Sequence, residues 1–118
     1  MLREMLQGKL HQGAVTACKL DYPGSLTVDQ DLLDAAGILV HQKIQLVNCN
    51  NGARLETYTI PGERGKGEII VNGAAARLAM PGDRVIVIAY AIMDEAEIRQ
   101  HRPKVVLLDG KNRIVQVI

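Results

Sequence analysis

Residues 84–93 read RVIVIAYAIM, and this stretch decides the fold class. β-branched and aliphatic side chains fill it, which favours an extended strand. Its apolar run, Val85 to Met93, is far shorter than the roughly 20 residues that a membrane-spanning helix needs. Five further stretches have a similar character, at 44–49, 54–60, 69–72, 105–108 and 114–117. The sequence therefore predicts a mainly β fold.

Turn-forming residues separate these strands closely. Asn51 and Gly52 lie between two strand patterns and predict a tight hairpin, and residues 109–112, DGKN, predict another. Residues 81–83, PGD, predict a reversal of the chain. Many short strands with little helix favour a closed or nearly closed β-barrel, in which parallel and antiparallel pairs can be mixed.

Three short helices are expected between the strands. The clearest runs from Gln30 to Ala36, with Asp29 as the N-cap and Gly37 as the residue that ends it. The patterns at 74–80 and 95–101 are weaker. The fold class predicted from local sequence is thus a β-barrel with short helices.

Length and charge exclude several classes of protein. The 118 residues fit one domain, 1–118, that can bury a core without disulfides. The net charge is +1, and lysine and arginine are scattered along the chain, so no basic face for nucleic acid is expected. The N-terminal residues lack the apolar segment of a signal peptide, which predicts a cytoplasmic protein with no membrane contact.

Neither histidine nor cysteine points to a metal site. His11, His41 and His101 are isolated in the sequence, and no pair of ligands has metal spacing. Cys18 and Cys49 are expected to be reduced and to pack as small buried residues.

Residues 22–25, YPGS, have a simple local interpretation. Proline at the second position and glycine at the third suit a type II turn, and serine commonly follows such a pair. Taken alone, this segment predicts a turn and no chemistry.

A set of longer blocks gives the segment a second interpretation. The blocks are KLH at 9–11, YPGS at 22–25, DQDLLDAAGIL at 29–39, NGAR at 51–54, Thr57-Tyr58, GERG at 62–65, VNGAAA at 71–76 and PGD at 81–83. Together they resemble the bacterial aspartate 1-decarboxylase family, whose members depend on a pyruvoyl group. The resemblance covers essentially the whole chain, in order.

The resemblance implies a fold, an assembly and a maturation step. The fold would be a double-psi β-barrel, assembled as a homotetramer in the cytoplasm. The precursor would cut itself between Gly24 and Ser25, giving a β chain of residues 1–24 and an α chain of residues 25–118. Ser25 would become the pyruvoyl group, so no separate cofactor is needed, although some lineages use a maturation factor. The enzyme would convert L-aspartate to β-alanine and carbon dioxide for pantothenate and coenzyme A.

The same resemblance assigns chemical roles to four residues. Ser25 is the nucleophile of processing, and its pyruvoyl group would form a Schiff base with the substrate amine and take up the electrons released with carbon dioxide. Tyr58 would return a proton to the α-carbon. Thr57 would donate to the oxyanion of processing or bind substrate, and Arg54 would hold the retained carboxylate. Alternation along a strand puts Arg54 and Tyr58 on one face and Thr57 on the other, so a shared pocket requires a bulge, an edge or a second subunit.

Other positions are expected near the substrate. Lys9 and His11 are two residues apart, so an extended segment would direct both to one side, where Lys9 can hold a carboxylate. His11 can equally orient Lys9 or lie at the surface, and Tyr22 is expected to line the pocket. Asn72 can donate near the scissile bond. The small residues Gly73, Ala74 and Ala75 would open a helix beside the substrate.

Two considerations oppose a simple transfer of the family's properties. Pro23 is not typical of the family, and it fixes φ beside the scissile pair and removes one amide donor. The alternative is a barrel used as a binding or oligomerisation module, in which the turn at Gly24 and Ser25 is purely structural.

Overall fold

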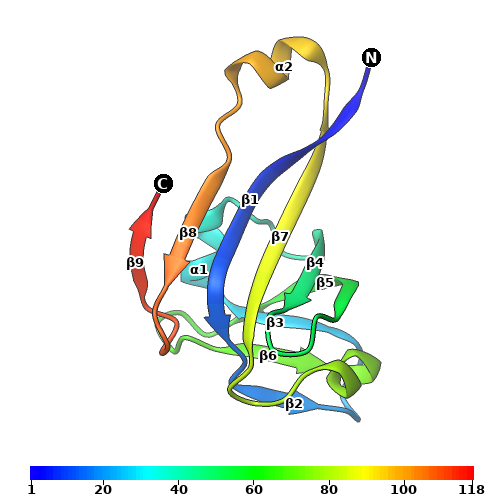
Figure 1. Ribbon diagram of the computed structural model, residues 1–118, viewed down its shortest axis with the longest axis vertical. Helices are drawn as coiled ribbons and strands as arrows, with labels where there is room; N and C mark the ends of the chain where they lie inside the picture. The colour runs from blue at the N-terminus through cyan, green and yellow to red at the C-terminus, as the bar shows by residue number, and fades with distance from the viewer.

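The computed structural model describes residues 1–118 (Figure 1). Nine strands, two short α-helices and one 3-10 helix make up the chain. The elements are β1 (Arg3–Ala14), β2 (Ala17–Lys19), β3 (Ser25–Asp29), α1 (Gln30–Ala36), β4 (Lys43–Asn48), β5 (Arg54–Gly62), β6 (Ile69–Asn72), η1 (Gly73–Leu78), β7 (Arg84–Met93), α2 (Glu95–Gln100), β8 (Lys104–Leu108) and β9 (Ile114–Val117).

The strands form one mixed sheet in the order β2-β6-β3-β5-β4-β7-β1-β8-β9. Three neighbouring pairs, β1 with β8, β2 with β6 and β3 with β5, are parallel, and the others are antiparallel. Strands β1 and β7 extend beyond the other strands as a long arm, with α2 at its far end (Figure 1). The predicted mainly β fold with short helices is confirmed, and this mixed sheet is compatible with a β-barrel.

The core is aliphatic, as the absence of tryptophan and phenylalanine requires. Eighteen buried residues form one cluster, to which α1 and most of the strands contribute. Leu10, Leu26, Leu33, Ile44 and Val87 are among its fully buried members. Because β3 contributes Leu26 and Val28 to this cluster, the strand that begins with Ser25 is fixed by packing along its length.

All six strands expected from the strongest apolar patterns are present, with ends that differ by at most two residues. The hairpin at Asn51-Gly52 and the turn at 109–112 are confirmed by antiparallel pairs β4–β5 and β8–β9. At the reversal of residues 81–83, the Asp83 N–H donates to the Met80 carbonyl at 3.0 Å. The expected short helix at 74–80 is the 3-10 helix η1.

Three strands lay outside the sequence prediction of regular structure, namely β1, β2 and β3. Strand β1 mixes glycine and polar side chains with its apolar ones, so its pattern is weak, but it pairs on both sides, with β7 and β8. Strand β2 has three residues, too few for a periodic signal. These strands are set by their partners.

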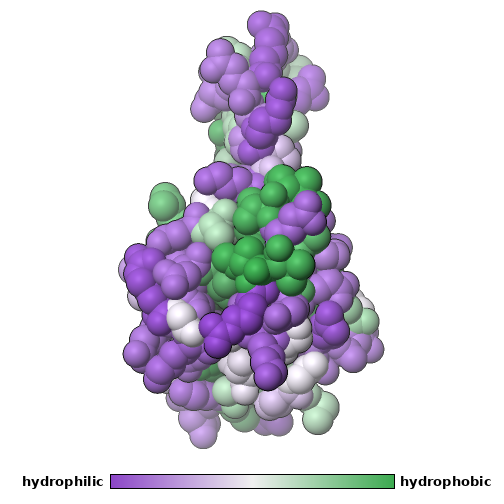
Figure 2. Space-filling model, turned by 90° about the vertical axis from the view of Figure 1, so that its left-hand side faces the viewer, coloured by the Kyte–Doolittle hydropathy of each residue, from purple (hydrophilic) through white to green (hydrophobic).

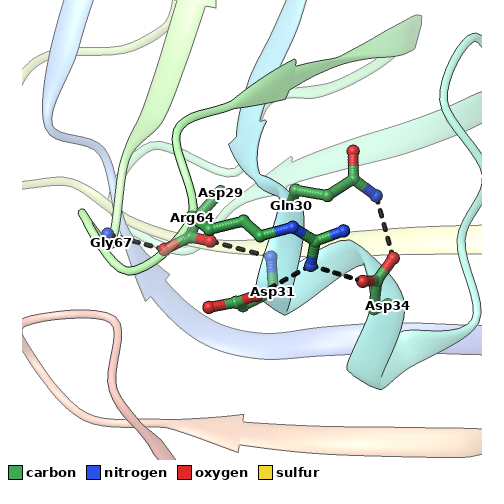
Figure 3. Close-up of polar contacts among 6 residues, drawn as sticks. All are labelled: Asp29, Gln30, Asp31, Asp34, Arg64 and Gly67. Atoms are coloured by element: carbon green, nitrogen blue, oxygen red, sulfur yellow. Dashed lines mark hydrogen bonds and ion pairs between the residues drawn. The ribbon is translucent and has the colours of Figure 1, made fainter.

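The prediction for α1 is confirmed at both ends. The Asp29 carboxylate accepts from the Asp31 N–H at 2.8 Å, and Gly37 ends the helix in the left-handed conformation, with φ 70°. The second carboxylate oxygen of Asp29 accepts from the Gly67 N–H, also at 2.8 Å (Figure 3). Asp29 is buried and both of its oxygens are satisfied, so it fixes the C-terminal end of β3.

The face on the side of β9 is mainly hydrophilic and carries an apolar patch (Figure 2). Strand β9 is an edge of the sheet and is exposed along its length, including Ile114, Val115 and Val117. None of the helices combines the length and apolar character that crossing a membrane would require.

The two cysteines differ from each other. Both are free, as expected, but Cys49 is exposed, so the prediction that both are buried is wrong for Cys49, which follows the end of β4. Cys18 is half-buried and its thiol donates to the Ala79 carbonyl. Burial, and then the nearby charge of Asp83, raises the pKa of the Cys18 thiol.

Candidate active site

Ser25 is the first residue of β3 and lies between two other strands. Its neighbours are β6 on one side and β5 on the other. The residue is 2 % exposed, and its φ of 124° is in a region that side chains strongly disfavour. Such a backbone conformation costs about 1–3 kcal/mol and needs its surroundings to hold it. The strain is therefore in the Ser25 backbone, at the N–Cα bond that follows the Gly24–Ser25 peptide bond.

The local prediction of a type II turn over residues 22–25 is wrong. That turn requires a positive φ at Gly24, and the positive φ occurs at Ser25 instead. The chain turns three residues earlier, where the Tyr22 N–H donates to the Lys19 carbonyl at 3.2 Å. Pro23 and Gly24 are exposed in the segment that leads into β3.

The glycine whose missing side chain matters is Gly73. Its φ is 69°, and a Cβ there would lie 2.8 Å from the Cα of Gly24 and 3.0 Å from its nitrogen. A Cβ on Gly24 itself would meet nothing within 4 Å. The strained φ is thus at Ser25 and the close approach is at Gly73, whereas the Cβ position of Gly24 is open.

Asn72 lies directly across from Ser25 in the antiparallel pair of β3 and β6. It is 1 % exposed, and its side-chain amide donates to Ser25 Oγ at 3.3 Å and to Thr27 Oγ1 at 2.9 Å. Asn72 also precedes η1, yet its side chain makes no capping bond to that helix. The amide is directed at β3.

Tyr58 approaches the Gly24–Ser25 bond from the other neighbouring strand. Its hydroxyl donates to the Gly24 carbonyl oxygen at 3.3 Å, and the side chain remains largely exposed to solvent. The burial of β5 alternates, with Arg54 and Tyr58 exposed and Thr57 half-buried, as the two-residue period predicts. Thr57 makes no side-chain hydrogen bond, so within one chain Tyr58 is the side chain that contacts this carbonyl.

The remaining candidates fall into two groups. Ala74 is exposed and Ala75 packs against the core, both in η1 next to Gly73. Tyr22 is exposed, and its carbonyl oxygen is 3.2 Å from the position of a Gly73 Cβ. These residues adjoin the Gly24–Ser25 segment.

Lys9, His11 and Arg54 lie elsewhere. Lys9 and His11 are on β1, which is separated from β3 by β5, β4 and β7 in the strand order. They alternate with buried residues, as their spacing predicts, and His11 Nδ1 is buried without a hydrogen-bond partner. The Arg54 guanidinium donates to Gln45 Oε1 on β4 at 2.8 Å. Within one chain, these three side chains make no hydrogen bond or ion pair with the Ser25 segment.

A surface hollow of about 240 Å³ lies on the Arg54 side of the sheet. Gln45, the partner of Arg54, lines it together with Glu4, Lys43, Ile44, Glu56, Tyr90, Ala91 and Ile92. None of the residues around Ser25 lines it. No group of three or more His, Cys, Asp or Glu side chains is arranged to hold a metal ion.

The residue around Ser25 that the sequence did not single out is Thr27. It is two residues after Ser25 on the same strand, so both side chains are on one face. The two-residue spacing of Ser25 and Thr27 is visible in the sequence. Asn72, which donates to Thr27, is 45 residues away in the sequence, so the contact could not be predicted from the spacing.

Comparison with known proteins shows the family of this chain. The fold and site define a small mixed β-sheet protein with a buried serine of positive φ directly after a glycine. The family described as aspartate decarboxylase matches residues 1–115. The chain therefore belongs to the aspartate decarboxylase family, as its sequence pattern had indicated.

Several curated relatives are similar over nearly their full length. An aspartate 1-decarboxylase of Bacillus velezensis is 56% identical over 118 residues, which is 100% of this chain and 93% of the relative. One from Carboxydothermus hydrogenoformans is 58% identical, covering 99% of this chain and 92% of the relative. One from Heliobacterium modesticaldum is 59% identical, covering 98% and 87%. This similarity supports an enzyme over the binding-module alternative.

Proposed function

We propose that this chain cleaves itself between Gly24 and Ser25 and then decarboxylates L-aspartate to β-alanine and carbon dioxide. The observation that carries the proposal is the state of Ser25. It is buried, it has a φ of 124°, and its Oγ is in contact with the Asn72 amide. A strained backbone that carries a fixed hydroxyl favours attack of that hydroxyl on the preceding carbonyl.

The processing step uses atoms of this chain. Ser25 Oγ attacks the Gly24 carbonyl carbon, the peptide C–N bond breaks, and the nitrogen takes up the hydroxyl proton, which leaves an ester. Loss of the Ser25 α-proton then breaks the Cβ–Oγ bond and releases residues 1–24 with a terminal carboxylate. Water converts the remaining dehydroalanine to a ketone with loss of ammonia.

Two side chains are proposed to stabilise the oxyanion that forms at the Gly24 carbonyl. The Tyr58 hydroxyl already donates to this oxygen at 3.3 Å, a long hydrogen bond for two oxygen atoms. Thr57 is kept as the second donor, or as a substrate contact, on the resemblance alone. Each donor to such an oxyanion typically contributes several kcal/mol when it is well placed.

The residues present fit a pyruvoyl group at position 25. Strand pairing with Asn72 and the close approach of Gly73 to Gly24 support this position from one side, and the new N-terminus would begin β3. When formed, the group supplies an electron sink for the loss of the α-carboxylate. Tyr58, with its exposed hydroxyl beside the cleavage point, is proposed to deliver the proton that the α-carbon then needs.

Substrate binding is proposed to need more than one subunit. Arg54 and Lys9 are the cations suited to the aspartate carboxylates, yet neither contacts the Ser25 region within one chain. In the homotetramer that the family resemblance implies, a neighbouring subunit can supply Arg54 and Lys9. The other residues proposed to line the substrate pocket are Gly73, Ala74, Ala75, Tyr22 and His11. We further propose that the enzyme is cytoplasmic and supplies β-alanine for pantothenate. Its cleavage would proceed either alone or with a maturation factor.

Intact-mass measurement tests the proposal. We expect purified protein to separate, under denaturing conditions, into fragments of residues 1–24 and 25–118, and to release carbon dioxide from aspartate. Ser25→Ala should remain whole. Tyr58→Phe should cleave more slowly, because it loses one donor to the oxyanion, and the cleaved variant should form β-alanine at least about 100-fold more slowly, because a positioned general acid contributes on that order.

The outcome that contradicts the proposal is equally clear. A wild-type chain that stays whole after long warm incubation, including with a cell extract as a source of maturation factor, and that releases no carbon dioxide, would overturn it. A separate variant, Pro23→Glu, tests the effect of the proline. It restores an amide donor beside the scissile pair, so a comparison of its cleavage rate with that of wild type shows whether Pro23 limits cleavage.

A further inference from the structure

We propose that Thr27 is a positioning residue for self-cleavage, because it holds the Asn72 amide against Ser25 Oγ. The inference rests on the proposed function and adds a residue to it. Thr27 does not touch the scissile bond itself, so its effect on cleavage would be transmitted through Asn72.

The three side chains share one face of the sheet. Ser25 and Thr27 are two residues apart on β3, and Asn72 is opposite Ser25 on β6. The Asn72 Nδ2 atom donates to both hydroxyl oxygens, at 2.9 Å to Thr27 and 3.3 Å to Ser25. The bond to Thr27 is the shorter one. An amide nitrogen has two hydrogens, so the bond to Thr27 uses one of them and directs the other toward Ser25.

Packing fixes the Thr27 hydroxyl. The Thr27 Cγ2 methyl lies against β5, where a Cβ on Gly62 would be 3.3 Å from it. A β-branched side chain in a strand has few χ1 conformations, so a methyl directed at β5 leaves the hydroxyl directed at β6. The threonine therefore presents its oxygen to Asn72 at little further cost in side-chain entropy.

Asn72 has a competing position that Thr27 opposes. Asparagine is a favoured N-cap, and Asn72 stands at the N-cap of η1, where its side chain would normally accept from an N–H of the first turn. No such bond is present. Without the Thr27 oxygen, rotation of the carboxamide toward η1 becomes favourable, and the contact with Ser25 Oγ is lost.

The contact with Oγ matters in the second half of processing. During elimination the Cβ–Oγ bond breaks, and Oγ departs as part of the Gly24 carboxylate, which takes the electron pair. The Ser25 α-proton goes to a base, and the Cα–Cβ double bond forms. An N–H directed at Oγ stabilises the negative charge that develops there. An amide turned away gives no such help.

Two variants of Thr27 separate its hydroxyl from its packing. Thr27→Val keeps the shape and the methyl groups but removes the oxygen, and Thr27→Ser keeps the oxygen. We expect Thr27→Val to cleave at least about fivefold more slowly than wild type, as loss of one orienting hydrogen bond predicts. Thr27→Ser should stay within about twofold. The readout is the fraction of intact chain over time by mass spectrometry, with circular dichroism to verify folding.

A double-mutant cycle gives the decisive measurement. If Thr27 acts through Asn72, Thr27→Val added to Asn72→Ala should cause no further slowing, whereas a general loss of stability would slow both backgrounds alike. Thr27→Ala carries the same expectation, should Thr27→Val not fold. Equal cleavage rates in wild type and Thr27→Val, or additive effects in the cycle, overturn the inference but leave the proposed function intact. A wild-type chain that never cleaves overturns both.

Discussion

Ser25 holds a backbone conformation that is rare for any residue with a side chain. Its φ of 124° is maintained by pairing with Asn72 and by burial between two strands. Next to it, Gly24 is unstrained and open, while Gly73 has both a positive φ and a close neighbour. At the residue scale, the site therefore depends on one strained serine and on a glycine from a different part of the sequence.

Gly73→Ala tests this dependence. The new Cβ would displace Gly24, so we expect self-cleavage to slow at least about tenfold, in addition to a loss of roughly 1–2 kcal/mol of stability from the left-handed backbone. Gly65→Ala is the matched control, because Gly65 has φ 83° and no atom within 4 Å of its Cβ position. It should lose similar stability and still cleave normally. Equal cleavage by both variants would show that contact with Gly24 is unimportant.

At the scale of elements, α1 is tied to the segment between β5 and β6. Arg64 from that segment donates to Asp31 at 2.8 Å and to Asp34 at 2.7 Å, and Gln30 also donates to Asp34 (Figure 3). The hydrogen bond from Arg64, and then that from Gln30, lowers the pKa of the Asp34 carboxyl below its ordinary value. These groups are exposed, so the network orients α1 more than it stabilises the fold.

The lowered pKa predicts a pH dependence. A carboxyl whose pKa is depressed in the folded state contributes stability above its unfolded pKa, and this contribution is lost as the pH falls below about 4. Arg64→Gln removes the guanidinium. As the pH is lowered from about 5 to about 3, the melting temperature of the variant should therefore fall less steeply than that of wild type. Thermal melts across this range measure the difference.

The control for this experiment is another exposed cation. Lys43 pairs with Glu56 at 3.1 Å across β4 and β5, so Lys43→Gln removes one positive charge without touching α1. If Lys43→Gln and Arg64→Gln flatten the pH dependence of the melting temperature equally, the cause is the change in net charge. The hydrogen bond between Arg64 and Asp34 would then not be the cause.

At the scale of the whole molecule, the proposed activity places substrate binding between subunits. The bond proposed to be cleaved is at the start of β3, but the cations expected to bind carboxylates are on β1 and at the start of β5. The exposed apolar residues of β9 and of β7 give the chain surface suited to association. Assembly is therefore a requirement of the proposed activity.

We expect native mass spectrometry to give a mass four times that of the 12.9 kDa chain. Dilution that dissociates the assembly should abolish aspartate decarboxylation, because Arg54 and Lys9 would then be separated from the Ser25 of a neighbour. A cleaved, fully active monomer would contradict the intersubunit arrangement of these cations.

Local sequence determined the parts of this protein that depend on neighbouring residues. The helix α1 begins at the Asp29 cap and ends at Gly37, and the hairpin at Asn51-Gly52 follows from turn chemistry, since each needs only a few adjacent side chains. The resemblance of long sequence blocks likewise identified the family before any geometry was known.

Only the tertiary structure decided the conformation of the site. Residues 22–25 favoured a type II turn locally, but pairing of β3 with β6 placed the positive φ at Ser25 instead. The hydrogen bonds of Asn72 with Ser25 and Thr27 span 47 and 45 residues of sequence. The close approach of Gly73 to Gly24 joins segments that are similarly far apart in the sequence. Such contacts exist only after distant strands pair, and their energy outweighs the local preference for the turn.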